Sequence, residues 1–236
     1  MAFVAHYHNA DYSLLMCGRF VLENSPEQLF KTYRLSSLPE LSPRYNIAPS
    51  QQIAVVRQQN GGDRELVSMK WGLVPSWSKD PTIGHKMINA RSETAHEKPS
   101  FKQALRSRRC IVPASDFYEW EKRGKEKIPH YIHMRDEEVM SLAGLWESWK
   151  SPEGMEIQTC TILTTAANSF VRRLHDRMPV ILHIEELDLW LNRDVDDVNS
   201  LTRLFHPYPS EQLLEHVVSK DVNNPANDHP GCIVPT

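Results

Sequence analysis

Residues 53–71 read IAVVRQQNGGDRELVSMKW, with the strand-like runs Ile53–Gln58 and Arg64–Trp71 on either side of Asn60-Gly61-Gly62-Asp63. Glycine adopts positive φ angles at little cost, so an Asn-Gly-Gly-Asp segment between two runs of β-forming residues is typical of a tight turn. The stretch therefore predicts an antiparallel β-hairpin.

Short strand-like runs continue outward from this hairpin, with few helices between them. Before it, Gly18–Glu23 alternates as a strand, and Ser25-Pro26-Glu27-Gln28 is typical of a helix start. Helices are also expected over residues 100–106 and 184–191 and from Asn168 onward. This pattern predicts a single α+β domain, a barrel-like and largely antiparallel β-sheet with a few flanking helices. Further strands are expected at Arg109–Val112, Asp116–Glu121, His130–Met134, Val139–Trp146 and Glu156–Thr164.

The composition is that of an ordinary globular protein, with 236 residues, 40% apolar and 24% charged. No apolar run approaches the ~18 residues that would span a membrane. Residues 1–15 lack the basic start and the apolar core of a signal peptide, so we expect a cytoplasmic protein that is associated with the nucleoid when it binds DNA. Because the net charge is −3, any contact with nucleic acid must come from a local basic groove.

The cysteines and histidines give no evidence of a metal site. The four cysteines, at positions 17, 110, 160 and 232, form no Cys-x-x-Cys pair, and His130 and His133 lie in a strand-like stretch. A zinc site needs ligands grouped more closely than this. We therefore expect no metal and no cofactor, and free thiols in a reducing compartment.

Cys17 directly follows a second methionine, in Met16-Cys17-Gly18-Arg19-Phe20. If the mature chain begins at Cys17, that residue is a 1,2-aminothiol. Its amine can form a Schiff base with an aldehyde, and its thiol can then close a thiazolidine ring on the same carbon. The amine titrates near ~7.7–8.0 and the thiol near ~8.5, so both nucleophiles are accessible at neutral pH. The pentapeptide alone favours the plainer interpretation of a small buried cysteine beside an internal methionine.

Three other patches combine reactive side chains with turns or aromatic residues. INARSET (88–94) follows the loop WGLVPSW (71–77), DFYEW spans 116–120, and LHDRMP spans 174–179. Each also has a plain structural interpretation. Glu119 fits a solvent-facing strand residue, His175 a helix cap, and Asn89 a turn residue. Arg19 and Arg91 fit surface charges, and Trp71 and Trp77 fit core aromatics.

The six motifs MCGRF, RYNIAP (44–49), WGLVPSW, INARSET, FYEW and LHDRMP occur in this order and together resemble the SOS response-associated peptidase (SRAP) family of abasic-site processing proteins. The resemblance covers the chain after Met16, and VVSKDVN (217–223) is similar to the family's final strand. It implies a monomer that recognises abasic sites in single-stranded DNA, couples to them covalently in the SOS response to DNA damage, and has no membrane association.

The resemblance also implies roles for individual residues. Met16 would be removed by self-processing or by an aminopeptidase, and Cys17 would capture the sugar aldehyde. Asn89 would hold the N-terminal residue and the sugar, Glu119 would be the acid–base carboxylate, and His175 would be a second proton-handling group. Of the DNA contacts, Arg19 and Arg91 would grip phosphates, Trp77 would stack on or wedge aside a base, and Thr164 would line the sugar site.

Physical chemistry supports these assignments. Aromatic neighbours should raise the pKa of Glu119 by desolvation, as a general acid near neutrality requires. Arginine forks suit phosphate oxygens, and aromatic stacking on an unpaired base is worth ~1–3 kcal/mol. A Schiff base is also an electron sink, so a lyase side reaction that eliminates the 3′ phosphate is chemically feasible until the thiazolidine closes.

Residues 1–15 are expected to be a tail outside the mature protein, and residues 16–236 the SRAP-like domain. With the tail attached, the nitrogen of Cys17 is an amide and cannot form an imine, so either translation starts at Met16 or the tail is cleaved. Two alternatives remain. One is a cysteine peptidase or amidohydrolase with Cys17 as the thiolate nucleophile, activated by His175 or by its own amine. The other is a non-covalent single-strand binder that uses the arginines and tryptophans.

Overall fold

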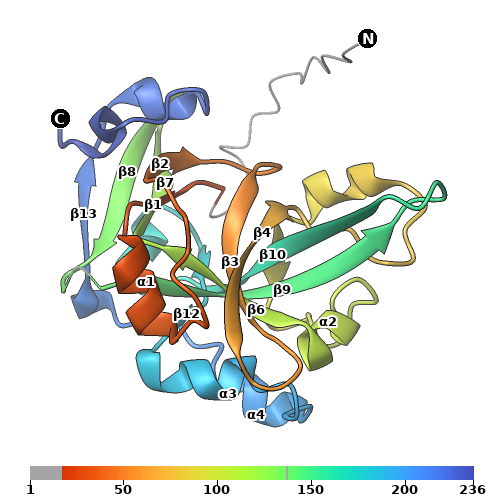
Figure 1. The fold of residues 1–236 in the computed structure, drawn as a ribbon. Helices are drawn as coiled ribbons and strands as arrows, with labels where there is room; N and C mark the ends of the chain where they lie inside the picture. The colour runs from red at the N-terminus through yellow and green to blue at the C-terminus, as the bar shows by residue number, and fades with distance from the viewer. Residues whose placement is uncertain (1–17, 137) are drawn as a thin grey trace.

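A computed structural model describes residues 18–136 and 138–236, and two β-sheets form its body (Figure 1). The first sheet has five strands in the order β13-β8-β7-β1-β2, and every neighbouring pair is antiparallel. Its strands are β1 (Phe20–Leu22), β2 (Arg44–Ile47), β7 (Asp116–Arg123), β8 (Glu126–Met134) and β13 (Leu213–Val217).

The second sheet has eight strands and is mixed. Its main path runs β11-β10-β4-β3-β6-β9-β12, and β5 pairs with β10 off this path. Strand β10 pairs in parallel with β4 and β5, whereas the other pairs are antiparallel. The strands are β3 (Gln52–Gln58), β4 (Arg64–Trp71), β5 (Asn89–Arg91), β6 (Arg109–Ala114), β9 (Met140–Lys150), β10 (Glu156–Ala166), β11 (Arg177–Pro179) and β12 (Ile181–Leu182).

The helices are short and lie around the sheets. In α1 (Pro26–Tyr33) the Ser25 side chain accepts a hydrogen bond from the Gln28 N–H at 3.2 Å, which confirms the predicted cap. The other α-helices are α2 (Lys102–Ser107), α3 (Leu187–Leu191) and α4 (Val198–Thr202). Single 3₁₀ turns form η2 (Pro81–Lys86), η3 (Val171–Arg173), η4 (Ile184–Glu186), η5 (Ser210–Gln212), η6 (Lys220–Asn223) and η7 (Pro230–Ile233).

Most of the predicted architecture is confirmed: an α+β fold with largely antiparallel sheets and few helices. The hairpin is β3–β4, and its turn holds Gly61 and Gly62 at φ of 115° and 99°, conformations that favour glycine. The helix expected from Asn168 is only the short turn η3. The prediction of a final strand over 217–223 is wrong, because β13 ends at Val217 and η6 follows.

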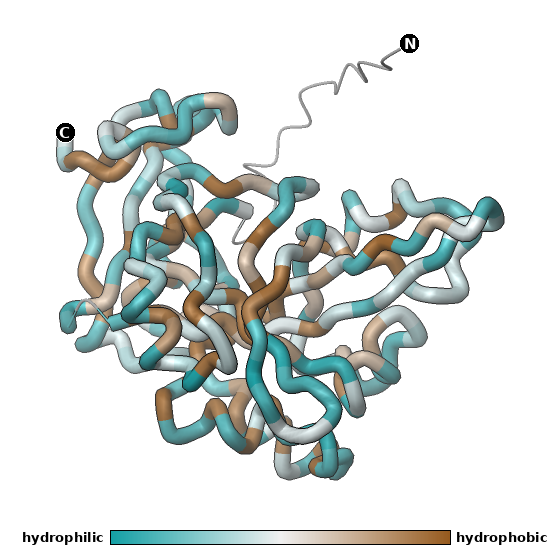
Figure 2. The backbone as a smooth tube through the Cα atoms, in the orientation of Figure 1, coloured by the Kyte–Doolittle hydropathy of each residue, from teal (hydrophilic) through white to brown (hydrophobic). Residues whose placement is uncertain are grey.

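Apolar residues fill both faces of the five-stranded sheet. Phe117 on β7 belongs to the main core shared with the eight-stranded sheet, whereas Tyr118 and Trp120 point to a smaller cluster beneath η6 and η7. Figure 2 shows the apolar segments along the strands and hydrophilic loop ends. Because successive side chains of a strand alternate between faces, Glu119 lies on the same face as Phe117. In the described part of the chain, none of the helices has the length and apolarity needed to cross a bilayer.

Candidate active site

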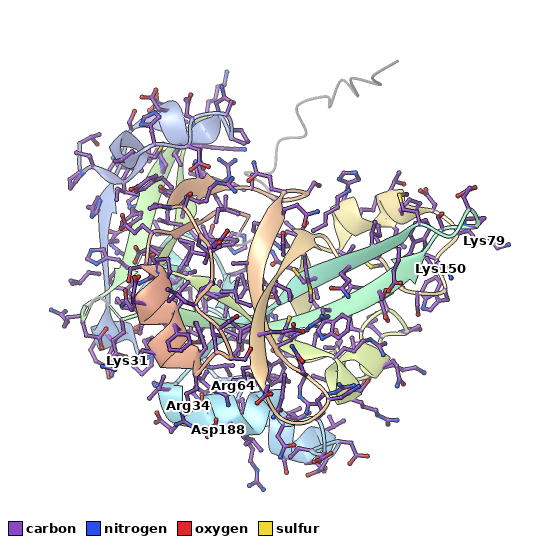
Figure 3. All side chains as sticks on the ribbon, in the orientation of Figure 1. Lys31, Arg34, Arg64, Lys79, Lys150 and Asp188 are labelled. Atoms are coloured by element: carbon purple, nitrogen blue, oxygen red, sulfur yellow. The ribbon has the colours of Figure 1, made fainter. Side chains whose placement is uncertain are left out.

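A pocket of about 350 Å³ opens where the end of β7 meets the loop after η3. Two of the predicted catalytic residues, Glu119 and His175, line it together. A larger hollow of about 430 Å³ lies elsewhere, where Arg34 and Arg64 point at Asp188 (Figure 3). Those charges pair with one another, and we take the smaller pocket as the candidate active site. Its lining comprises Glu119, Trp120, Glu121, Lys122, Arg173, Leu174, His175 and Asp176.

Glu119 is a buried carboxylate in the middle of a sheet. Strand β7 is flanked by β1 and β8, and Glu119 is only 3% exposed. The interpretation of Glu119 as a solvent-facing strand residue is therefore wrong. The neighbouring Trp120 donates its indole N–H to Asn223 Oδ1 at 2.8 Å, which fixes the strand on its other face. Because β7 is paired with a strand on each side, the Glu119 side chain has a fixed position at the wall of the pocket.

His175 lies in the loop after η3, where its backbone N–H donates to the Val171 carbonyl at 3.0 Å. Its Nδ1 is 3.1 Å from the backbone N of Arg177 and 2.9 Å from Asp176 Oδ1. These contacts require different proton positions on the ring. Nδ1 without a proton accepts from the Arg177 N–H, and the neutral ring then carries its proton on Nε2, whereas Nδ1 with a proton donates to Asp176.

Burial lowers the pKa of His175, and Asp176 partly opposes this while Lys122 and Arg177 add to it. Since desolvation disfavours the charged ring, the neutral state with Nε2–H dominates at neutral pH. His175 therefore presents a hydrogen-bond donor at Nε2.

Replacing Asp176 with asparagine is expected to lower the pKa of His175 further. Asp176 is the group that raises this pKa, so removing its charge leaves burial, Lys122 and Arg177 unopposed. NMR titration of the His175 ring should then give a midpoint at lower pH than in the wild type. Asp194→Asn, at another exposed position, should leave the midpoint in place. An unchanged or raised midpoint in Asp176→Asn would show that the carboxylate does not act on this ring.

Asn89 and Thr164 are brought together by parallel pairing of β5 with β10, in which Asn89 lies opposite Ile162 and Arg91 opposite Thr164. Thr164 is fully buried, and its carbonyl accepts hydrogen bonds from the Ser92 N–H at 2.9 Å and from Arg177 Nη2 at 2.6 Å. The interpretation of Asn89 as a turn residue is thus wrong, because it lies in a strand.

Arg177 connects this strand pair to the His175 loop. Its guanidinium makes a bidentate contact with Glu93, with Nη2 2.8 Å from Oε2, and the hydrogen bonds from Arg177 hold the pKa of Glu93 below its usual value. One arginine therefore joins the INARSET and LHDRMP motifs.

The predicted DNA-contacting residues differ in their exposure to solvent. Arg91 is exposed on β5. Trp77 is 59% exposed, whereas Trp71 is buried, so only Trp71 is a core aromatic. The loop that carries Trp77 folds back through a close approach of two glycines, and a Cβ on Gly72 would lie 2.6 Å from the Gly84 carbonyl oxygen.

Arg19 is only 4% exposed, so its interpretation as a surface charge is wrong. Its Nη1 donates to Asn46 Oδ1 and to the Val222 carbonyl, both at 2.6 Å, and burial lowers its pKa to about 10. The guanidinium thus holds β1 against η6, and its phosphate contact stays a prediction. Cys17 lies outside the described residues.

The family model for the SOS response associated peptidase (SRAP) matches residues 16–225. The chain belongs to the SRAP family. It is 44% identical over 222 residues to the abasic site processing protein YoqW of Bacillus subtilis (strain 168), covering 92% of this chain and 99% of that protein. It is 35% identical to the abasic site processing protein HMCES of Gallus gallus, covering 82% of this chain and 66% of that one.

Solved structures agree with the SRAP assignment in fold. A protein from Bacteroides thetaiotaomicron superimposes with a TM-score of 0.83 at 27% identity, covering 93% of this chain and all of that one. A Bordetella bronchiseptica protein gives a TM-score of 0.75 at 26% identity, covering 86% of this chain and 100% of that one.

Several residues around the SRAP-family pocket escaped the sequence analysis. Asp176 and Arg177 directly follow His175 in the LHDRMP motif. Their charged side chains could have indicated from the sequence that they act on His175. Lys122, Arg173 and Glu121 lie in no motif, and only the fold brings them to the pocket. Within the described residues, no group of three or more His, Cys, Asp or Glu side chains could hold a metal ion.

Proposed function

We propose that this chain binds abasic sites in single-stranded DNA and captures them covalently through an N-terminal Cys17, forming a thiazolidine DNA–protein crosslink. The related proteins YoqW and HMCES are named as abasic site processing proteins. The buried carboxylate of Glu119 shares a pocket with His175, which gives two proton-handling groups in one place.

The observation that carries the proposal is the position of the chain just after Cys17. The Tyr118 N–H donates to the Arg19 carbonyl at 3.0 Å, and Phe20 lies opposite Phe117. The start of β1 therefore lies beside Glu119. The described chain that follows Cys17 thus starts beside a residue of the pocket, which supports Cys17 as the proposed nucleophile.

The chemistry balances with these groups. Glu119 protonates the ring oxygen of the sugar and takes up the proton of the C1′ hydroxyl as the ring opens to the aldehyde. The amine of Cys17 then adds to C1′, and one of its protons moves to the former carbonyl oxygen. The resulting carbinolamine loses its hydroxyl as water when Glu119 delivers a proton, and the nitrogen returns a proton to Glu119, which leaves an imine. The thiol then adds to the imine carbon and its proton moves to the nitrogen. Aldehyde and aminothiol thus give thiazolidine and one water.

The remaining residues position the substrate in this proposal. Neutral His175 donates from Nε2 to a sugar oxygen, and Asn89 holds the N-terminal residue and the sugar, beside the buried Thr164. Exposed Arg91 and Trp77 contact a flanking phosphate and a base, which suits recognition of single strands. Hydrolysis of the Met16–Cys17 bond, by the protein itself or by an aminopeptidase, generates the nucleophile, and elimination of the 3′ phosphate from the imine is a lyase side reaction.

A denaturing gel tests the proposal directly. Protein whose intact mass shows that it starts at Cys17 is mixed with a single-stranded oligonucleotide carrying one abasic site. A shifted band that survives boiling is expected, and none with the undamaged oligonucleotide. Blocking the aldehyde with methoxyamine beforehand should prevent the band. Correctly processed protein that gives no band would refute the crosslinking function.

A further inference from the structure

A charged cluster outside all six motifs adjoins the pocket from β8. His130 is 5% exposed, its Nδ1 pairs with Glu215 Oε2 of β13, and its Nε2 is 3.3 Å from Glu121 Oε2 of β7. The other oxygen of Glu215 is 2.6 Å from Arg173 Nη2. Three strands therefore meet at one imidazole, and η3 joins them through the contact of Arg173 with Glu215.

Both ring nitrogens of His130 face carboxylate oxygens. A neutral imidazole has only one N–H, so it can satisfy only one of these two acceptors. The imidazolium donates to Glu121 and Glu215 together, and charge-assisted hydrogen bonds of this kind are the stronger ones. Only the charged ring can therefore satisfy both carboxylates at once.

This cation lies next to the catalytic carboxylate of the proposed mechanism. His130 is the residue directly opposite Glu119 in the β7–β8 pairing. Such cross-strand neighbours share a face of the sheet, with Cβ atoms about 4.5–5.5 Å apart. Glu121 and Arg173 line the same pocket, and Arg173 comes two residues before His175 in the chain. Arg173 also donates from Nε to the Phe170 carbonyl at 2.9 Å.

We propose that His130 is a positioning residue of this site: as an imidazolium it fixes Glu121, Glu215 and, through Glu215, Arg173 around the pocket, and it places a positive charge beside Glu119. The inference rests on the proposed function, because it concerns how Glu119 acts as a general acid. Residues that flank the cation from other elements determine its net effect. They are Glu119, Glu121 and Arg123 of β7, Glu215 of β13 and Arg173 of η3, with Lys122, His175 and Asp176 around the adjoining pocket.

The sign of the pH effect follows from these charges. A general acid loses activity as pH rises and its proton is lost. The His130 cation favours the ionised carboxylate, so removing it leaves less positive charge beside Glu119 and makes Glu119 hold its proton to higher pH. The alkaline limb of the rate profile should then move to higher pH. The acid limb, set by the amine of Cys17, should stay in place and serve as an internal reference.

The test measures single-turnover crosslinking to abasic single-stranded DNA between pH 5 and pH 10, together with thermal melting. His130→Gln should raise the midpoint of the alkaline limb by about half a pH unit or more with an undiminished final yield. His130→Lys keeps a cation and should restore the wild-type midpoint. His133→Gln is the matched control, because His133 is on the same strand but its ring packs against Tyr131 and His216 on the other face.

Glu215→Gln separates an electrostatic role from loosened packing. Glu215→Gln removes a negative charge, so the midpoint of its alkaline limb should fall or stay in place. Loosened packing would instead shift the midpoints of His130→Gln and Glu215→Gln in the same direction. Equal slowing of His130→Gln at every pH, or an upward shift in Glu215→Gln, would overturn the inference. If His130→Gln does not fold, the pH profiles of Glu215→Gln and His130→Lys test the inference, with the same expected midpoints as above. A wild type that forms no crosslink refutes the proposed function, whereas an active wild type with an unshifted His130→Gln refutes only this inference.

Discussion

Protein that retains residues 1–16 ahead of Cys17 is expected to form no boiling-resistant adduct with abasic DNA, whereas protein that starts at Cys17 should convert the oligonucleotide fully. The nitrogen of an internal cysteine is an amide whose lone pair is delocalised into the carbonyl, so it cannot attack an aldehyde to give an imine. Without the imine, the thiol has no carbon on which to close the five-membered ring. The measurement is a denaturing gel with intact mass taken before and after the reaction.

Two variants of the shorter protein sharpen this expectation. Cys17→Ser keeps the free amine, so its imine should be trapped by borohydride although no stable adduct forms without reduction. Cys160→Ala should crosslink normally, because Cys160 is fully buried and burial raises the pKa of its thiol far above neutrality. Stable trapping of the lesion by a chain whose mass still includes residues 1–16 would show that Cys17 is not the attacking residue.

The fold was predictable wherever local signals and tertiary contacts agreed. The Asn-Gly-Gly-Asp turn and the Ser25 cap are local, and both form as expected. The strand that the family resemblance implied over residues 217–223 does not form, because the Ser219 side chain accepts a hydrogen bond from the Asp221 N–H at 3.2 Å and starts η6. The parallel pairing of β5 with β10 could not be predicted from the sequence, because it joins segments more than sixty residues apart.

Sequence reasoning named two residues that share a pocket, but it could not predict the environment of each side chain. The motifs identified Glu119 and His175, and the fold brings both to one pocket. Arg19 shows the limit of sequence reasoning, because an arginine in a short motif gives no sign of burial. Its partner carbonyl at Val222 is 203 positions away. Asn46 of RYNIAP likewise donates to the carbonyls of Val222, Asn224 and Asn227. The structural role of Asn46 is therefore to hold the C-terminal segment in place.

Glu119→Gln in protein that starts at Cys17 is expected to slow crosslinking by about 10²–10⁴-fold, the usual contribution of a positioned general acid. Glutamine has almost the same shape as glutamate and can hydrogen-bond in the same place, but it cannot deliver a proton to the sugar ring oxygen or to the departing hydroxyl. Single-turnover rates on the abasic oligonucleotide measure the effect. The alkaline limb of the pH profile should also disappear, because the group that produces it is gone.

Glu126→Gln on β8 provides the matched control, since it makes the same chemical change where the carboxylate pairs with Lys220 at the surface. It should crosslink at the wild-type rate. Melting temperatures distinguish lost chemistry from lost structure: a Glu119→Gln protein that melts like the wild type and still crosslinks slowly has lost the proton donor. A folded Glu119→Gln protein that crosslinks within tenfold of the wild-type rate and keeps its alkaline limb would exclude Glu119 as the proton donor, and His175 would then be the remaining titratable side chain of the predicted catalytic set on the pocket wall.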